Sequence, residues 1–146
     1  MNLLRRKTLL GATAALLLKP FAALAAWNKD AFGAKTPADA LKSLGVAGAQ
    51  PSKDLVIDAP QIAENGAVVP IEIESRIPGT TSLTVLIDKN PFPLNSRFTF
   101  LDGALPFVKL NVKMGETSEV RVLAQAGGRY YAASQEIKVT IGGCGG

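Results

Sequence analysis

The chain contains no histidine, and Cys144 is its only cysteine. Without histidine, the usual forms of Cys–His and Ser–His nucleophilic catalysis are excluded, together with most zinc and copper sites. A single cysteine excludes C-x-x-C redox chemistry and internal disulfides. The pair Gly127-Gly128 lacks the sequence context of a phosphate-binding loop. A self-contained enzyme is therefore disfavoured, and we expect no metal and no cofactor.

An excess of one charge is also missing once the N-terminus is set aside. The formal net charge of +4 equals the contribution of four basic residues near the N-terminus, Arg5, Arg6, Lys7 and Lys19, where no acid occurs. The rest of the chain carries equal numbers of basic and acidic residues. The sequence therefore predicts neither a basic patch for nucleic acid nor a polybasic membrane segment.

Residues 1–26 have the pattern of a cleaved export signal. Arg5-Arg6-Lys7 precede an apolar run over residues 8–18, and small residues end in Ala23-Leu24-Ala25-Ala26. The paired arginines Arg5 and Arg6 indicate the twin-arginine route, with a Sec signal as the alternative. The apolar run is shorter than the ~20 residues of a spanning helix. We expect a periplasmic protein.

Residues 27–52 are predicted to form a short helix and a linker. Thr36 is a good N-cap, and Gly45 is a typical residue at which a helix ends. Leu41 and Leu44 are three residues apart, so they share one face of this helix. That face is expected to pack on the domain that follows.

Residues 53–141 alternate between apolar and polar side chains, which predicts strands. Asn65-Gly66 predicts a tight hairpin between strands 55–63 and 67–75. Pro70 places the second of these strands at a sheet edge or beside a bulge. Further strands are expected over residues 82–88, around Phe98 and Phe100, over 107–113, around Val120 and Val122, from Arg129 and up to Ile141.

Seven or eight short strands with turns at this spacing predict an all-β fold. We expect one antiparallel β-sandwich of immunoglobulin-like type, with the short helix before it and a flexible arm after it. A barrel is the alternative. The last strand would lead directly into residues 142–146.

Those residues, Gly142-Gly143-Cys144-Gly145-Gly146, hold the lone thiol between two glycine pairs. Glycine populates positive φ as readily as negative, so the segment is expected to be a swinging arm. Its reach is roughly 10 Å beyond Ile141. A free thiol is largely protonated near neutral pH, and no base is adjacent in the sequence. Activation would therefore have to come from another protein.

The terminal Gly142-Gly143-Cys144-Gly145-Gly146 resembles the end of the SoxY family, the sulfur carrier subunits of the periplasmic thiosulfate-oxidising Sox system. The segments 63–70 (AENGAVVP) and 88–94 (DKNPFPL) are also similar to that family. With the export signal and the sandwich pattern, the resemblance covers essentially the whole chain.

The resemblance implies a carrier that is acted on by enzymes and is not itself an enzyme. Cys144 would be the covalent attachment site for sulfur intermediates, and Gly142, Gly143, Gly145 and Gly146 would form the arm. The implied partners are a SoxZ-like subunit in a heterodimer, a c-type cytochrome that loads thiosulfate, a dimanganese hydrolase that releases sulfate, and a molybdenum–haem sulfane dehydrogenase in some systems.

A different class of function also fits the residues. Exposed thiols on flexible tails dimerise readily on oxidation. The alternative is therefore a periplasmic β-sandwich binding or structural module whose lone cysteine forms an intermolecular disulfide. A mixed disulfide as the resting state would favour this alternative, whereas a sulfur-oxyanion adduct would favour the carrier.

Overall fold

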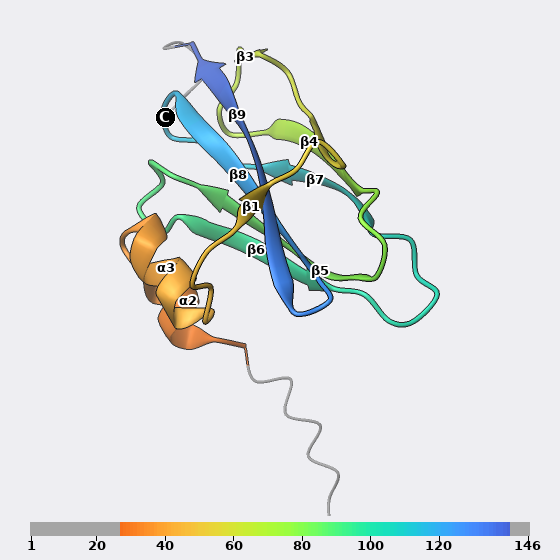
Figure 1. The fold of residues 1–146 in the computed structure, drawn as a ribbon. Helices are drawn as coiled ribbons and strands as arrows, with labels where there is room; N and C mark the ends of the chain where they lie inside the picture. The colour runs from red at the N-terminus through yellow and green to blue at the C-terminus, as the bar shows by residue number, and fades with distance from the viewer. Residues whose placement is uncertain (1–26, 141–146) are drawn as a thin grey trace, which may run out of the picture.

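Alternating apolar residues build two β-sheets in the computed structural model, which describes residues 27–140. Within this range two short helices precede nine strands (Figure 1). The elements are α2 (Lys29–Gly33), α3 (Pro37–Ser43), β1 (Gln50–Pro51), β2 (Leu55–Asp58), β3 (Ile62–Ala63), β4 (Val69–Ser75), β5 (Thr80–Ile87), β6 (Leu94–Thr99), β7 (Phe107–Val112), β8 (Ser118–Ala126) and β9 (Arg129–Val139).

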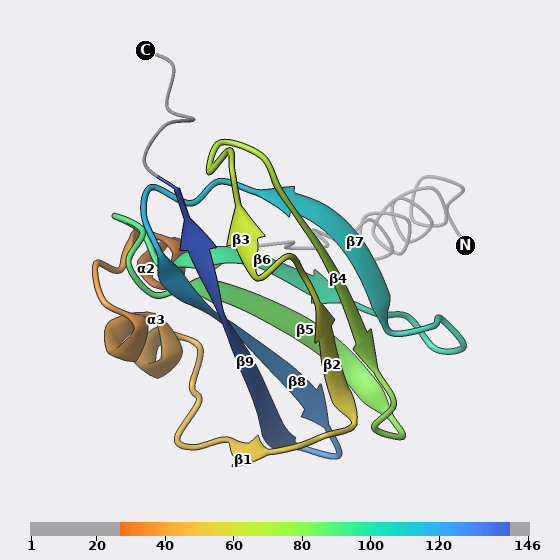
Figure 2. The same ribbon diagram turned by 90° about the horizontal axis from the view of Figure 1, so that it is seen from above.

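The expected β-sandwich is confirmed. The larger sheet has the order β1-β9-β8-β5-β6, and β3 also pairs with β9. Its long strands are antiparallel neighbours, whereas the two-residue strands β1 and β3 pair with β9 in parallel. The smaller sheet is antiparallel, in the order β2-β4-β7. The two sheets face each other in Figures 1 and 2, so the barrel alternative is wrong.

The main core lies between the two sheets, because each strand turns alternate side chains toward the other sheet. Burying one such aliphatic side chain stabilises the fold by about 1.5–3 kcal/mol. The largest fully buried members come from both sheets, from β4, β5, β8 and β9: Val69, Ile71, Ile73, Leu83, Val85, Ile87, Val120, Val122 and Ile137, together with Met114 after β7.

Helix α3 forms as predicted. The Thr36 Oγ1 accepts a hydrogen bond from the backbone N–H of Asp39 at 3.1 Å, and Gly45 takes a positive φ of 72° after the helix end. Leu41 and Leu44 belong to a second apolar cluster on the outer face of the larger sheet. The predicted packing of this face is therefore confirmed.

Helix α2 was not predicted from the sequence, although a capping residue marks its start. Asn28 accepts a hydrogen bond from the N–H of Ala31 through Oδ1 at 2.9 Å. Its Nδ2 donates to the carbonyl of Ser43 at 2.8 Å and so connects the two helices. Ala31 and Ala40 are fully buried, which lets both helices lie close to the sheet.

The tight turn predicted at Asn65-Gly66 is wrong, although the two strands that it was expected to join do pair antiparallel, as β2 and β4. The pairing between β2 and β4 stops at Asp58, and β3 crosses to pair with β9 in the other sheet. Neither Asn65 nor Gly66 has the positive φ that a type I′ turn requires. Asn65 instead accepts a hydrogen bond from the N–H of Ala67 through Oδ1 at 2.9 Å.

Gly66 is needed for a close approach between segments, not for a turn. Its carbonyl accepts a hydrogen bond from the N–H of Met114 at 2.7 Å. A Cβ at position 66 would overlap the carbonyl oxygen of Met114 and lie 2.8 Å from Cγ1 of Val139. Residue 66 is therefore where the loop before β4, the segment after β7 and the end of β9 meet.

Strand β4 is central in its sheet, which corrects the edge position predicted from Pro70. The proline is tolerated because of where its nitrogen points. Ser75 donates its N–H to the carbonyl of Pro106, on the side of β7, at 2.9 Å. Successive residues of a strand point their backbone N–H and C=O groups to opposite sides. The odd-numbered residues of β4 therefore face β7, and the nitrogen of Pro70 faces away from it. On that other side β2 pairs only as far as Glu72, so no ladder bond is lost.

We predict that Gly66→Ala lowers the free energy of unfolding by about 1–3 kcal/mol, because the added methyl group has no room. Urea unfolding measures this change. Gly115→Ala is the matched control, since a Cβ there meets nothing within 4 Å and its φ is not positive. Equal unfolding midpoints for the two variants would show that the close approach at residue 66 is not tight.

Candidate functional site

The predicted site residues lie outside the described part of the chain. Cys144 and the glycines Gly142, Gly143, Gly145 and Gly146 follow the last described residue, Thr140, and Arg5 and Arg6 precede the first. Their predicted roles stay predictions. The part of the site that the structure describes is the end of β9, from which the chain continues toward Cys144.

The end of β9 is held from two directions. Lys138 donates its N–H to the carbonyl of Gln61 at 2.9 Å, and Thr140 donates to the carbonyl of Ala63 at 3.1 Å. Between them, Val139 donates its N–H to Oγ1 of Thr117 at 3.0 Å. Residues 138–140 are therefore fixed although β8 pairs with β9 only as far as Ile137.

Three loops gather around this strand end, and we call residues 59–68, 88–93 and 113–118 together the exit face (Figure 2). Asn90 donates through Nδ2 to the carbonyl of Lys113 at 2.8 Å and accepts from the N–H of Gly115 at 3.4 Å. The N–H of Lys89 donates to Oγ of Ser118 at 3.0 Å. The two internal segments that resemble the SoxY family, 63–70 and 88–94, thus both contribute to the exit face.

Chain length limits how far Cys144 can be from this face. Cys144 is four positions after Thr140, and an extended chain spans at most about 3.6 Å per residue. The Cα of Cys144 therefore lies within about 14 Å of the Cα of Thr140 in any conformation. A protein that reacts with Cys144 must approach the exit face.

The described residues offer no metal-binding cluster for such a reaction. Within residues 27–140, no group of three or more His, Cys, Asp or Glu side chains is placed to hold a metal ion. The same range contains no helix that is long and apolar enough to cross a membrane.

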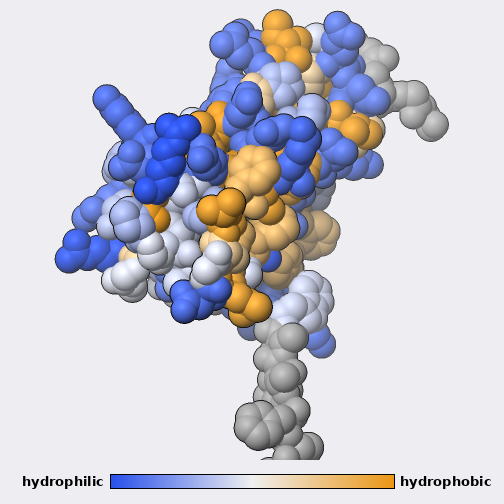
Figure 3. Space-filling model, turned by 90° about the vertical axis from the view of Figure 1, so that its right-hand side faces the viewer, coloured by the Kyte–Doolittle hydropathy of each residue, from blue (hydrophilic) through white to orange (hydrophobic). Residues whose placement is uncertain are grey.

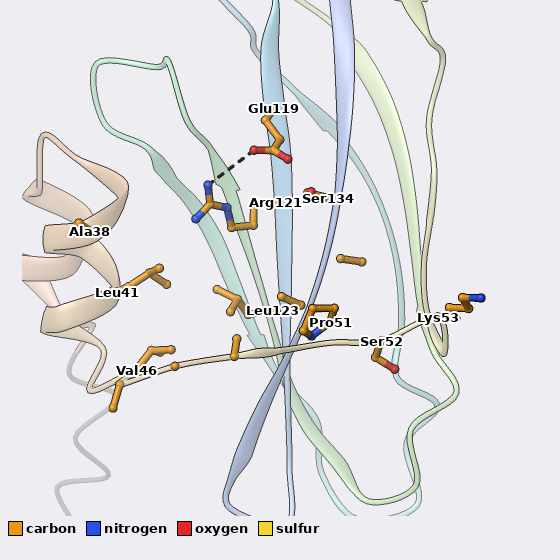
Figure 4. Close-up of a pocket in the computed structure, with 15 residues that line it drawn as sticks. Ala38, Leu41, Val46, Pro51, Ser52, Lys53, Glu119, Arg121, Leu123 and Ser134 are labelled. Carbon is orange, nitrogen blue, oxygen red and sulfur yellow. Dashed lines mark ion pairs between the residues drawn. The ribbon is translucent and has the colours of Figure 1, made fainter.

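A separate groove of about 840 Å³ lies between α3 with its linker and the outer face of β8 and β9 (Figure 4). One end is apolar, with Leu41, Val46 and Leu123. The other end is charged, because Glu119 and Arg121 extend from β8. Its lining residues are Ala38, Leu41, Val46, Ala47, Gly48, Ala49, Pro51, Ser52, Lys53, Glu119, Arg121, Leu123, Ala132, Ala133 and Ser134.

At the charged end, Arg121 connects the groove to the loop after β5. Its Nη2 lies 2.6 Å from Oδ2 of Asp88 and 3.6 Å from Oε2 of Glu119. Burial raises the pKa of the Asp88 carboxyl, while the charge of Arg121 acts to lower it. Oδ1 of Asp88 is buried with no hydrogen-bond partner in the described part of the chain. Arg121 is therefore the main compensation for this carboxylate.

This ion pair was not predicted from the sequence. Arg121 lies between Val120 and Val122, where alternation indicates only a side chain on the outer face. The sequence singled out Asp88 only as part of the segment 88–94, which resembles the SoxY family. Nothing in a single sequence shows that two residues 33 positions apart meet.

We predict that Arg121→Gln lowers the free energy of unfolding by about 1–3 kcal/mol at pH 7, and by less at pH 4. The folded state holds the Asp88 proton more tightly than the unfolded chain does, so ionisation of Asp88 reduces stability as the pH rises above about 4. Without Arg121, ionisation of Asp88 lowers the free energy of unfolding further. Denaturant unfolding at both pH values measures the difference.

Glu119→Gln is the matched control for that experiment. Glu119 is 45% exposed and lies farther from Arg121 than Asp88 does, so its removal is expected to change stability by about 0.5 kcal/mol or less. If Arg121→Gln has the same effect at both pH values, the pairing with Asp88 does not stabilise the fold.

Two comparisons identify relatives of this chain. A family model described as "Sulfur oxidation protein SoxY" matches residues 41–144. The solved structure of the sulfur carrier protein SoxY from Chlorobium limicola f thiosulfatophilum is 38% identical, with a TM-score of 0.65, over 71% of this chain and 96% of that chain.

One further solved structure resembles the chain only weakly. A solved structure of an engineered protein is 14% identical with a TM-score of 0.42, over 60% of this chain and 20% of that one. No curated protein matches the chain.

The solved SoxY is an immunoglobulin-like β-sandwich, as this chain was predicted to be. Its likeness and the family match support a carrier role in sulfur oxidation. Because the family match extends from helix α3 to Cys144 and covers more than half of the sequence, the chain belongs to the SoxY family of sulfur oxidation proteins.

Proposed function

We propose that this protein carries sulfur intermediates covalently on Cys144 during thiosulfate oxidation. The observation that carries the proposal is the position of the only cysteine, within the family match and four residues beyond a strand end that is held on two sides. Gly142, Gly143, Gly145 and Gly146 form the arm on which the thiol moves. The folded domain supplies a fixed base for that arm.

The loading step joins thiosulfate to the thiol by oxidation. The terminal sulfur of thiosulfate forms a bond to the Cys144 sulfur, one proton leaves the thiol, and two electrons pass to a c-type cytochrome. The product is a cysteine S-thiosulfonate. Partner enzymes supply the oxidant and the base, because no base is adjacent to Cys144 in the sequence.

Later steps also take place on partner proteins. A dimanganese hydrolase adds water to the sulfone sulfur and releases sulfate, leaving a sulfane sulfur on Cys144. A sulfane dehydrogenase oxidises that sulfur in systems that contain one, and a second hydrolysis regenerates the thiol. The carrier itself holds no cofactor in this scheme.

We also propose that the chain works in the periplasm as a heterodimer with a SoxZ-like subunit. Arg5 and Arg6 direct the folded pair through the twin-arginine route. The resemblance implies a SoxZ-like subunit without an export signal of its own, and export after folding would carry both chains on one signal.

The test of the carrier role is Cys144→Ala in a reconstituted system with thiosulfate and the partner enzymes. Sulfate release that depends on the carrier should fall to the background without carrier, with the unfolding midpoint unchanged. Wild-type sulfate release from the variant would contradict covalent carriage on Cys144. A wild-type protein that only forms disulfide-linked dimers would support the cross-linking alternative.

We predict that Gly143→Val slows loading about tenfold or more while leaving the unfolding transition unchanged. A β-branched side chain beside Cys144 restricts the backbone and blocks entry to a narrow site, and small misplacements of reacting groups cost up to about 100-fold in rate. The rate of adduct formation under single-turnover conditions measures this. Equal rates for wild type and variant would show that the arm needs no glycine at this position.

A further inference from the structure

Strand β7 is an uncovered edge of the smaller sheet. It pairs with β4 through an unbroken register from Phe107 to Val112 and has no second neighbour among the described strands. Strand β6 is the corresponding edge of the larger sheet, but its pairing skips Asn95 between Leu94 and Ser96. A regular edge without a bulge or a proline is a template for another strand.

The backbone groups that face outward from β7 follow from the ladder. Pro106 accepts a hydrogen bond from Ser75 of β4, so its carbonyl faces β4. Every second residue of a strand faces the same side, so the backbone groups of residues 108, 110 and 112 also face β4. The N–H and C=O groups of Lys109 and Asn111 therefore face away from the sheet. Phe107 also faces outward, but its N–H already donates to the carbonyl of Leu105 at 2.9 Å.

The charged side chain on β7 does not cover this edge. Lys109 forms an ion pair with Glu72 on the neighbouring strand β4, and this contact raises the pKa of Lys109. The two residues share one face of the smaller sheet, since they are opposite each other in the register. This is the outer face, because Ile71 and Ile73 on either side of Glu72 are buried in the core. The side chain of Lys109 is therefore held over its own sheet.

Apolar side chains surround the start of the same strand. Leu101 is 83% exposed, Leu105 is 84% exposed and Phe107 is 48% exposed. Apolar atoms gather in the middle of this side of the molecule in Figure 3. Four half-buried apolar residues from the end of β6 and from β7 pack against the core: Phe98, Phe100, Val108 and Leu110.

This patch lies far from the exit face. Strand β7 runs from Phe107 to Val112, about 17 Å at 3.3 Å per residue, and only then does the chain reach Met114 beside Gly66 (Figure 2). A protein that covers this apolar patch leaves most of the exit face open, although a strand that also bonds to Asn111 would end close to residue 113. This position suits a permanent partner, whereas the enzymes that act on Cys144 must come to the exit face.

We propose that the free edge of β7 is where the partner subunit binds, by adding an extended strand of its own to the smaller sheet. The strand would bond to the backbone of Lys109 and Asn111, and its apolar side chains would cover Leu101, Leu105 and Phe107. This inference rests on the heterodimer of the proposed function and adds the surface and the binding mode.

A second copy of this chain fits the edge less well. Two antiparallel registers pair the β7 strands of a symmetric dimer over most of their length. One sets Lys109 opposite Lys109 of the other copy, and like charges in that position destabilise a strand pair. The other sets Phe107 opposite Lys113. Neither gives the exposed apolar residues an apolar neighbour, so a strand from a different chain is the better occupant.

The test compares Asn111→Pro with Asn111→Ala in binding to the co-produced SoxZ-like subunit. Proline removes the outward N–H of residue 111 without taking a bond from β4, whereas alanine keeps that N–H and is the matched control. We expect the dissociation constant to rise about tenfold or more for proline and to stay within about twofold for alanine. Equal constants for both variants, each with the wild-type unfolding midpoint, would overturn the proposal.

Hydrogen exchange on the wild-type protein tests the same surface without a substitution. The amides of Lys109 and Asn111 should become protected when the SoxZ-like subunit is added. Protection elsewhere without protection at these two amides would overturn the proposal, as would protection by self-association without the partner. Adduct formation on Cys144 is measured separately, so a failed carrier and a misplaced interface are distinguishable.

Discussion

The hydrogen bonds that fix residues 138–140 of β9 are the constraint on which the proposed function depends. Ala63 and Gln61 hold the strand from one direction and Thr117 holds it from the other, beyond the point where β8 ends its pairing. In the proposed carrier, these bonds give the chain that leads to Cys144 a fixed starting point. The close approach at Gly66 serves the same end, since it brings the loops of the exit face against Val139.

Different surfaces of one small domain therefore have different tasks. The exit face surrounds the strand that leads to Cys144, and β7 presents its free edge on another side. The outer face of the larger sheet carries α2, α3 and the groove that ends at Arg121. The ion pair of Arg121 with Asp88 connects this face to the loop 88–93 of the exit face. A sandwich suits this division because its two sheets form one rigid core.

Much of this fold could be predicted from the sequence because its signals are local. Alternation along 69–75 and 107–113 reflects burial of one strand face, and the caps Thr36 and Gly45 determine α3. Strand β5 is instead buried on both faces from Ser82 to Ile87, because the helices cover its outer side at Leu86. The two-residue strands β1 and β3 could not be predicted, since a parallel pairing of that length leaves no periodicity. The turn predicted at Asn65-Gly66 was wrong because a glycine is equally suited to a tight turn and to a close approach between two segments. Only the position of Met114 in the fold shows that Gly66 is needed for a close approach. The pairing of Asp88 with Arg121 depends on register, which a single sequence does not contain.

The central claim is that Cys144 bears the sulfur. The most direct measurement is an intact mass spectrum of the protein purified from cells supplied with thiosulfate, recorded before and after reduction and followed by peptide mapping. We expect a reductant-labile mass increase, corresponding to a thiosulfonate or to added sulfane sulfur, on the peptide that contains Cys144. Unmodified protein, or a simple disulfide dimer, under the same conditions would contradict it.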